Sequence, residues 1–125
     1  MKDCGVGKGV GVDLNRNYDA KWQLGDPMIG ASKWCKDQSY QGASVFSEPE
    51  SIAQSNYILS IKPKSYLTIH SYAQVVLFPY TWTRDAERPH NYDELFELSA
   101  EITKRIDGNW RHGQGEITFC IFYIF

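Results

Sequence analysis

The sequence lacks the features by which several large classes of protein are recognised. It has 13 lysine and arginine residues against 15 acidic ones and no basic cluster, so we expect no nucleic-acid partner. No apolar run approaches the ~20 residues of a membrane span, so we expect no membrane partner. The three cysteines form no CxxC pair, which argues against a zinc site built from thiolates.

Glycine is concentrated near the start, in "GVGKGVG" at residues 5–11, but the spacing fits no phosphate-binding motif. A P-loop requires Ser or Thr after its Gly-Lys pair, whereas Lys8 is followed by Gly9. The dinucleotide motif would need glycine in place of Val10. The same stretch has no apolar core of the signal-peptide kind. We therefore expect neither nucleotide binding nor an export signal in these residues.

What is present has the composition of a globular protein. With 42% hydrophobic and 22% charged residues, a chain of 125 residues is expected to form one domain. Residues 20–46 have no periodicity and are expected to be loop. A first helix is expected over residues 47–61, with Ser47 as N-cap, Glu50 completing a capping box and Pro63 as the stop.

Two strands, over residues 66–70 and 75–80, are expected next, followed by a helix over residues 91–106 that starts at Asn91 and stops before Gly108. Glu94 would complete a capping box with Asn91. The expected apolar face of this helix is formed by Leu95, Leu98, Ile102 and Ile106. With the apolar end "ITFCIFYIF", this order predicts an α/β fold: a mixed, mostly parallel sheet with helices on both faces.

Two stretches carry residues suited to chemistry. His70 interrupts the apolar run "SYLTIHSYAQVVLFPY", either as a core histidine bonded to a carbonyl or as a metal ligand or base. Asn15 and Arg16 lie in "GVDLNRNYDAKW", where a guanidinium fork and an amide would suit a carboxylate. Arg16 would alternatively pair with Asp13 or Asp19 in a surface loop. The residues alone leave both choices open.

Taken in order, the segments "GVDLNRNYD", "SYQG", "SEPES" and "TIHSYAQVVLFPY" closely resemble those of the zinc carboxypeptidases of the carboxypeptidase A and B family. The resemblance extends over residues 10–118, and its two main motifs are jointly specific at this separation. It implies the mixed α/β fold of that family. It also implies zinc-dependent release of C-terminal residues, with peptide or protein C-termini as partners.

The family's roles transfer residue by residue. His70 matches the third zinc ligand, at the end of a central strand, and Ser71 and Tyr72 match residues that contribute to substrate subsites. Asn15 and Arg16 match the pair that binds the free carboxylate of the substrate. These roles are chemically sensible because a catalytic zinc keeps an open position for water and an exopeptidase must recognise a chain end.

The sequence departs from the family in two places. It has no His-x-x-Glu motif, so one zinc ion would find one of its three expected ligands. His90 and Asp93 are interpreted as a loop histidine and a first-turn acid, and His112 as part of a turn. No counterpart of the water-activating glutamate follows "GEITF", so no catalytic residue is predicted. Residues 1–125 are therefore interpreted as the central part of a catalytic domain, incomplete at both ends and inactive alone.

Two alternatives stay open: a non-catalytic relative that binds peptide C-termini, and a truncated gene product without function. The resemblance also implies that the intact protein is secreted. It implies a disulfide between Cys4 and Cys35, which would leave Cys120 free.

Overall fold

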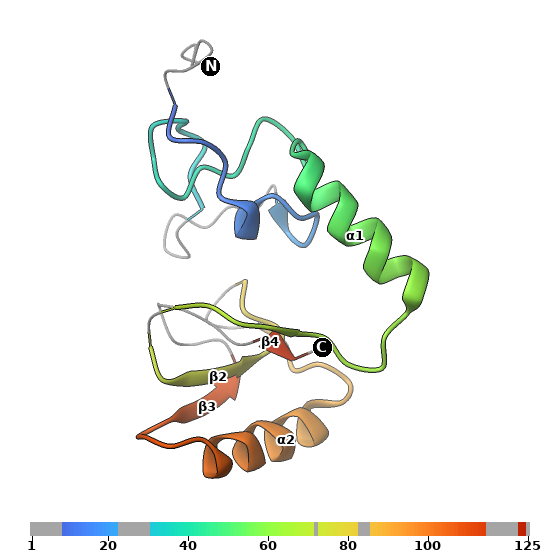
Figure 1. Ribbon diagram of the computed structural model, residues 1–125, viewed down its shortest axis with the longest axis vertical. Helices are drawn as coiled ribbons and strands as arrows, with labels where there is room; N and C mark the ends of the chain where they lie inside the picture. The colour runs from blue at the N-terminus through green and yellow to red at the C-terminus, as the bar shows by residue number, and fades with distance from the viewer. Residues whose placement is uncertain (1–8, 23–30, 72, 83–85, 115–122, 125) are drawn as a thin grey trace. The chain divides into compact units, whose positions relative to one another are not determined.

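The computed structural model describes residues 9–22, 31–71, 73–82, 86–114 and 123–124. The chain forms two compact units, Met1–Lys62 and Pro63–Phe125, and each is described by itself. The first contains a short 3-10 helix, η1, and one α-helix, α1 (Figure 1). The second contains four strands and the helix α2.

Outside η1 and α1, the described part of the first unit is mostly loop, and the loop predicted for residues 20–46 is found where that segment is described, at residues 20–22 and 31–46. Turns and a single bridge between Ser32 and Tyr40 occupy the described part of that segment. The 3-10 helix η1 spans Leu14–Arg16 and begins at Asp13, whose carboxylate accepts a hydrogen bond from the Asn15 N–H at 3.0 Å. This is ordinary N-capping, in which a side-chain oxygen satisfies an amide that has no partner within the helix.

Helix α1 spans Pro49–Ile61, one residue later than an N-cap at Ser47 would require. Glu48 occupies the N-cap position, and its own side chain makes no capping bond. The predicted capping box is therefore wrong, because the Ser47 hydroxyl bonds elsewhere. The predicted stop is confirmed: Lys62 is left-handed at φ 45° and bonds back to Ile58 O before Pro63.

The second unit contains one sheet with the strand order β1-β4-β2-β3. Its strands are β1 (Leu67–Thr68), β2 (Val75–Phe78), β3 (Arg111–Gln114) and β4 (Tyr123–Ile124). Strand β2 pairs in parallel with β3 and β4, whereas β1 and β4 are antiparallel. The prediction of a mixed, mostly parallel sheet is confirmed. His112 lies in β3, so its assignment to a turn was wrong: Gly113 holds a strand position opposite Leu77.

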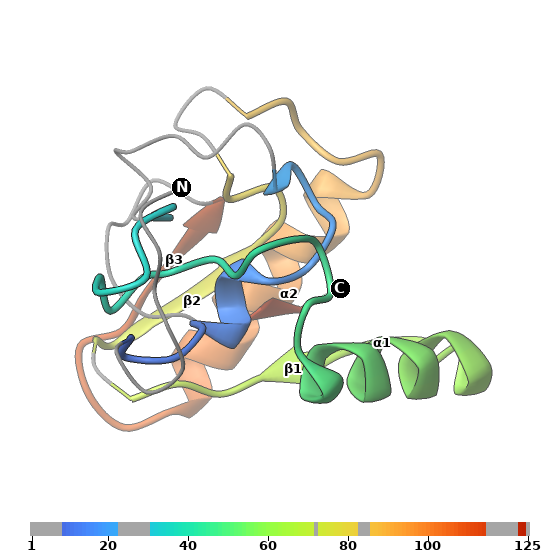
Figure 2. The same ribbon diagram turned by 90° about the horizontal axis from the view of Figure 1, so that it is seen from above.

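Helix α2 spans Tyr92–Arg105 and packs against β2 and β3, covering one face of that strand pair (Figure 2). Asn91 is the N-cap residue as predicted, but its side chain makes no capping bond and the predicted box with Glu94 does not form. Leu98 was wrongly placed on the buried face: it is 45% exposed. The buried positions are Leu95 and Ser99.

The apolar core of the second unit consists of Val76, Phe78 and Leu95. Three partly buried residues pack against it: Tyr92, Ile102 and Trp110. All four residues of β2 are buried, which explains the uninterrupted apolar run that predicted this strand. Within the part of the chain that is described, no helix has the length and apolar character needed to cross a bilayer.

Candidate functional site

The predicted site residues lie in both units. Asn15 and Arg16 form part of η1 in the first unit. Two backbone bonds shape this turn, from Arg16 N–H to Asp13 O at 2.9 Å and from Asn17 N–H to Leu14 O at 3.1 Å. A third, from Asp13 N–H to Tyr40 O at 2.8 Å, ties the turn to the loop that follows.

The guanidinium of Arg16 has almost no partner in the described part of the chain. Its Nε is buried without a hydrogen bond, and Nη1 makes a long 3.5 Å contact with Asn15 O. Among the described residues the ion pairs involve Glu101 and not Arg16, so the alternative pairing with Asp13 or Asp19 is not found. A buried donor without an acceptor lowers stability by about 1–3 kcal/mol. Arg16 is therefore suited to bind an anion that takes up its free donors.

Asn15 is exposed, and among the described residues its hydrogen bonds are made by its backbone N–H and C=O and not by its side chain. Its backbone N–H donates to the Asp13 carboxylate, and its exposed side-chain amide belongs to the residue directly before Arg16. Together the two residues offer a planar cation and an adjacent amide donor. That combination suits a carboxylate oxygen pair better than any neutral group.

Asn17 follows Asn15 and Arg16 in the sequence motif, and the sequence analysis gave it no role; it is fully buried at 0% exposure. Its Nδ2 lies within hydrogen-bonding distance of three acceptors: Gln41 O at 3.0 Å, Ser44 O at 3.1 Å and Ser47 Oγ at 2.8 Å. Its Oδ1 accepts from Glu48 N–H at 3.2 Å and Ser51 Oγ at 2.6 Å. The start of α1 is therefore capped by a side chain 31 residues away in sequence, in place of a local box.

Gly42 makes room for this network. Its φ is +91°, a conformation that favours glycine, and it is buried. A Cβ at this position would lie 2.5 Å from Asn17 Nδ2 and would also meet Ser47 Oγ. The glycine of the "SYQG" segment thus has a structural role that its sequence position alone does not reveal.

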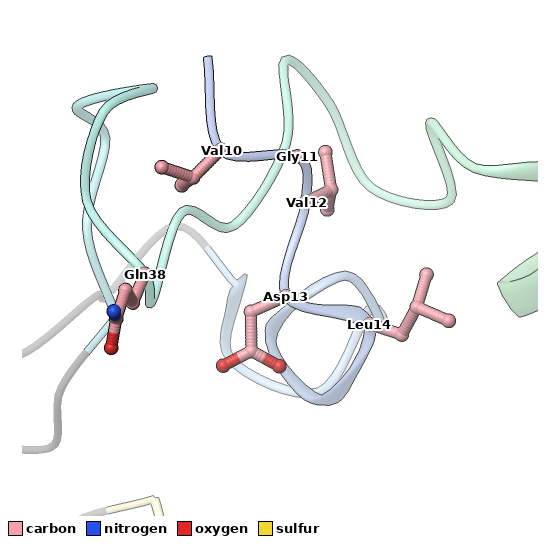
Figure 3. Close-up of a pocket in the computed structure, with 6 residues that line it drawn as sticks. All are labelled: Val10, Gly11, Val12, Asp13, Leu14 and Gln38. Atoms are coloured by element: carbon pink, nitrogen blue, oxygen red, sulfur yellow. The ribbon is translucent and has the colours of Figure 1, made fainter.

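An open hollow of about 470 Å³ lies beside the same turn (Figure 3). Its lining residues are Val10, Gly11, Val12, Asp13, Leu14 and Gln38. Arg16 and Asn15 are not among them, and the charged group on its wall is a carboxylate. The hollow is therefore electrostatically unsuited to the carboxylate that Asn15 and Arg16 would bind.

His70 belongs to the second unit and follows β1 by two residues. Its ring is partly buried, and Nε2 lies 3.2 Å from Thr68 Oγ1. In the described sheet β1 is an edge strand, because β4 is its one neighbour there, so the expected central position is not found. Ser71 is exposed, and Tyr72 lies outside the described residues.

The described residues do not make a complete metal site: no group of three His, Cys, Asp or Glu side chains converges among them. His90 is exposed ahead of α2 and Asp93 lies in its first turn, as predicted. His112 Nδ1 lies 3.1 Å from the Ser99 hydroxyl, and its ring packs 4.9 Å from that of Phe96. A catalytic zinc needs three protein ligands, and His70 alone does not satisfy it.

Cys35 is buried and disulfide-bonded. Its carbonyl accepts a hydrogen bond from Val10 N–H at 3.1 Å, so Val10 lies against it. Cys4 and Cys120 lie outside the described residues, so the pairing with Cys4 stays a prediction.

Three comparisons relate the chain to known proteins. A family model described as zinc carboxypeptidase matches residues 3–121. Carboxypeptidase O of Bos taurus is 37% identical over 82% of this chain and 26% of its own length. Carboxypeptidase B of Bos taurus is 41% identical over 78% of this chain and 22% of its own length. A crystal structure of thrombin activatable fibrinolysis inhibitor matches at TM-score 0.70 and 32% identity, over 84% of this chain and 27% of that one. The chain thus spans about a quarter of the length of these relatives.

Proposed function

The chain belongs to the zinc carboxypeptidase family, and from that premise we propose that it contributes the carboxylate-binding part of an enzyme that releases C-terminal residues from peptides. The observation that carries the proposal is that Arg16 has no ion pair among the described residues and its Nε is buried without a hydrogen bond, beside the exposed Asn15. An exopeptidase must distinguish a chain end from an internal peptide bond. A guanidinium does so by binding the terminal carboxylate through two parallel hydrogen bonds.

In this proposal His70 is one ligand of the catalytic zinc. The remaining ligands and the water-activating carboxylate would come from parts of the protein beyond this chain, and we assign no catalytic step to the residues described. Ser71 and Tyr72 would contribute to substrate subsites. The substrates would be peptide or protein C-termini, and the intact protein would be secreted like the family members it resembles.

The experiment is an exopeptidase assay on a chimaera in which this chain replaces the matching segment of Bos taurus carboxypeptidase B. Arg16→Ala should lower kcat/KM by about 30- to 1,000-fold, because a charge-assisted bidentate contact to the substrate carboxylate is lost. Arg16→Lys should recover little of this activity, since an ammonium keeps the charge but not the planar fork.

The matched control is Arg105→Ala. Arg105 is 81% exposed on α2 and lies 3.9 Å from Glu101, so its loss should leave kcat/KM unchanged. Full activity of the Arg16→Ala chimaera would overturn the assignment of the carboxylate site. Binding of peptide C-termini without turnover in the natural full-length protein would instead favour the non-catalytic alternative.

A further inference from the structure

We propose that Asn17 is a positioning residue that holds Arg16 for the substrate carboxylate, an inference that rests on the function proposed above. Asn17 directly follows η1, and its buried side chain has contacts within hydrogen-bonding distance at both its nitrogen and its oxygen. Asn17 belongs to the segment "GVDLNRNYD" that carries the family resemblance, but the sequence assigns it no role of its own. Its role comes from what it bonds to.

The backbone of Asn17 connects two segments. Its N–H bonds to Leu14 O at 3.1 Å and closes η1, and its carbonyl accepts from Phe46 N–H at 2.8 Å. Phe46 has a positive φ of 51°, an uncommon conformation for this residue type. The bond from Asn17 therefore helps to hold a strained point of the loop that leads into α1.

The side chain of Asn17 extends this connection in two directions. Its amide nitrogen donates toward the carbonyls of Gln41 and Ser44, which belong to the loop. Its amide oxygen accepts from Glu48 N–H and Ser51 Oγ, which belong to the start of α1. Only an amide side chain of this length both donates and accepts here. Aspartate would turn a carboxylate toward two carbonyl oxygens, and alanine would leave several buried groups unpaired.

Among the described residues Arg16 has no comparable anchor of its own: its Nε is unpaired and its Nη1 makes one long contact, to Asn15 O. The direction of its side chain is therefore set by the backbone of η1, and η1 is held by Asn17. Rigid placement matters because a misplacement of about 1 Å in a positioning group costs on the order of 100-fold in rate.

The first test is hydrogen exchange on the 125-residue chain. Asn17→Asp should speed exchange of the Arg16, Phe46 and Glu48 amides by about tenfold or more relative to those of β2. The milder variant is Ser51→Ala, which removes one bond to Asn17 Oδ1 and should speed exchange at the same amides to a smaller extent.

Ser99→Ala is the matched control for Ser51→Ala. Ser51 and Ser99 are both 0% exposed, and each donates to the backbone carbonyl three residues earlier, Glu48 O for Ser51 and Phe96 O for Ser99. The second partner of Ser99 is His112, whereas the second partner of Ser51 is Asn17. Ser99→Ala should therefore leave hydrogen exchange of the η1 amides unchanged. Unchanged exchange at Arg16 in both Asn17→Asp and Ser51→Ala would overturn the inference.

The second test is a double-mutant cycle in the chimaera. Asn17→Asp should lower kcat/KM by about 10- to 100-fold when Arg16 is present and by less than about threefold in the Arg16→Ala background, because coupled residues are not additive. An equal loss in both backgrounds would mean that Asn17 supports the fold without positioning Arg16. A full-activity Arg16→Ala enzyme would instead contradict the proposed function, while the exchange result would still report on the Asn17 network.

Discussion

The two units of the chain bury different kinds of side chain. In Met1–Lys62 the buried residues include Asn17, Gln41 and Ser51, whose hydrogen bonds join segments distant in sequence. In Pro63–Phe125 they are mainly the apolar residues of β2 and Leu95 of α2. Both units belong to one family segment, yet one is held by directed polar bonds and the other by apolar contact.

This difference between the two units affects how strictly each one fixes the positions of its side chains. An apolar core contributes roughly in proportion to buried area and tolerates changes of shape at moderate cost. A buried polar network is stable only when each donor and acceptor is paired, and it then fixes one geometry. The predicted carboxylate-binding pair lies in the polar unit, directly before Asn17, whose amide nitrogen and oxygen are both hydrogen-bonded. Pairing in this unit is not complete among the described residues, because Gln41 Nε2 is buried without a hydrogen bond.

The largest effect is expected from Phe78→Ala in the second unit. Phe78 is 0% exposed and its ring meets that of Tyr92 edge-on at 5.4 Å, so its loss should lower the free energy of unfolding by about 3–5 kcal/mol. Phe96→Ala, at a residue 43% exposed, is the control and should cost less. Chemical denaturation measures the difference. Equal effects would contradict the apolar core described here.

Loss of the Cys35 disulfide should weaken the first unit. If Cys4 is the partner, the bond closes a loop of ~30 residues and should contribute about 3–4 kcal/mol by the chain-entropy estimate. Peptide mapping without reduction identifies the pair, and denaturation of Cys35→Ser measures the loss. Cys120→Ser should leave the disulfide of Cys35 intact. A peptide linking Cys35 to Cys120 would show the predicted pairing to be wrong.

Gly42→Ala tests the polar network sterically and should be compared with Gly11→Ala. Both glycines have left-handed φ values, +91° and +96°, but a Cβ at Gly11 meets no atom within 4 Å. Gly11→Ala should therefore cost only the backbone strain, about 1–2 kcal/mol. Gly42→Ala adds a clash with Asn17 and should cost about 1–3 kcal/mol more. Thermal unfolding measures both losses of stability. Equal losses would mean that the side chains around Asn17 can move to accommodate the added methyl group.

The smallest effect is expected at Glu101, which belongs neither to the polar network of the first unit nor to the apolar core of the second. The hydrogen bond from Lys104 at 2.7 Å and the positive charge of Lys104 lower the pKa of this exposed carboxylate. Because the folded pKa is lowered, the stabilisation is present above the ordinary glutamate pKa of about 4.3 and is lost as the pH falls through the folded value. Glu101→Gln should lower the midpoint of thermal unfolding slightly at pH 7 and not at pH 2–3.

Sequence reasoning succeeded where the signal is local. The apolar run of β2 predicted a buried strand, and Pro63 predicted the end of α1. It failed where a distant group decides the outcome. Ser47 and Glu50 form a good local capping pattern, but Asn17 Oδ1 takes the Glu48 N–H, so the box does not form.

The candidate site divides in the same way. Asn15, Arg16 and His70 were identified because their residue types and their order match a family pattern, which is a property of the sequence. The atomic positions were needed to see that Arg16 has no ion pair among the described residues and that Asp13 caps the turn instead of neutralising Arg16.

The sequence by itself determined the family, the mixed α/β class and the position of the buried strand, because these follow from motif order and from apolar patterning along the chain. Only the tertiary structure decided the role of Asn17 and the need for glycine at position 42. The physical reason is that a buried amide has no preferred local partner. Its function is defined by acceptors and donors 24 to 34 residues away, and folding alone brings them within hydrogen-bonding distance.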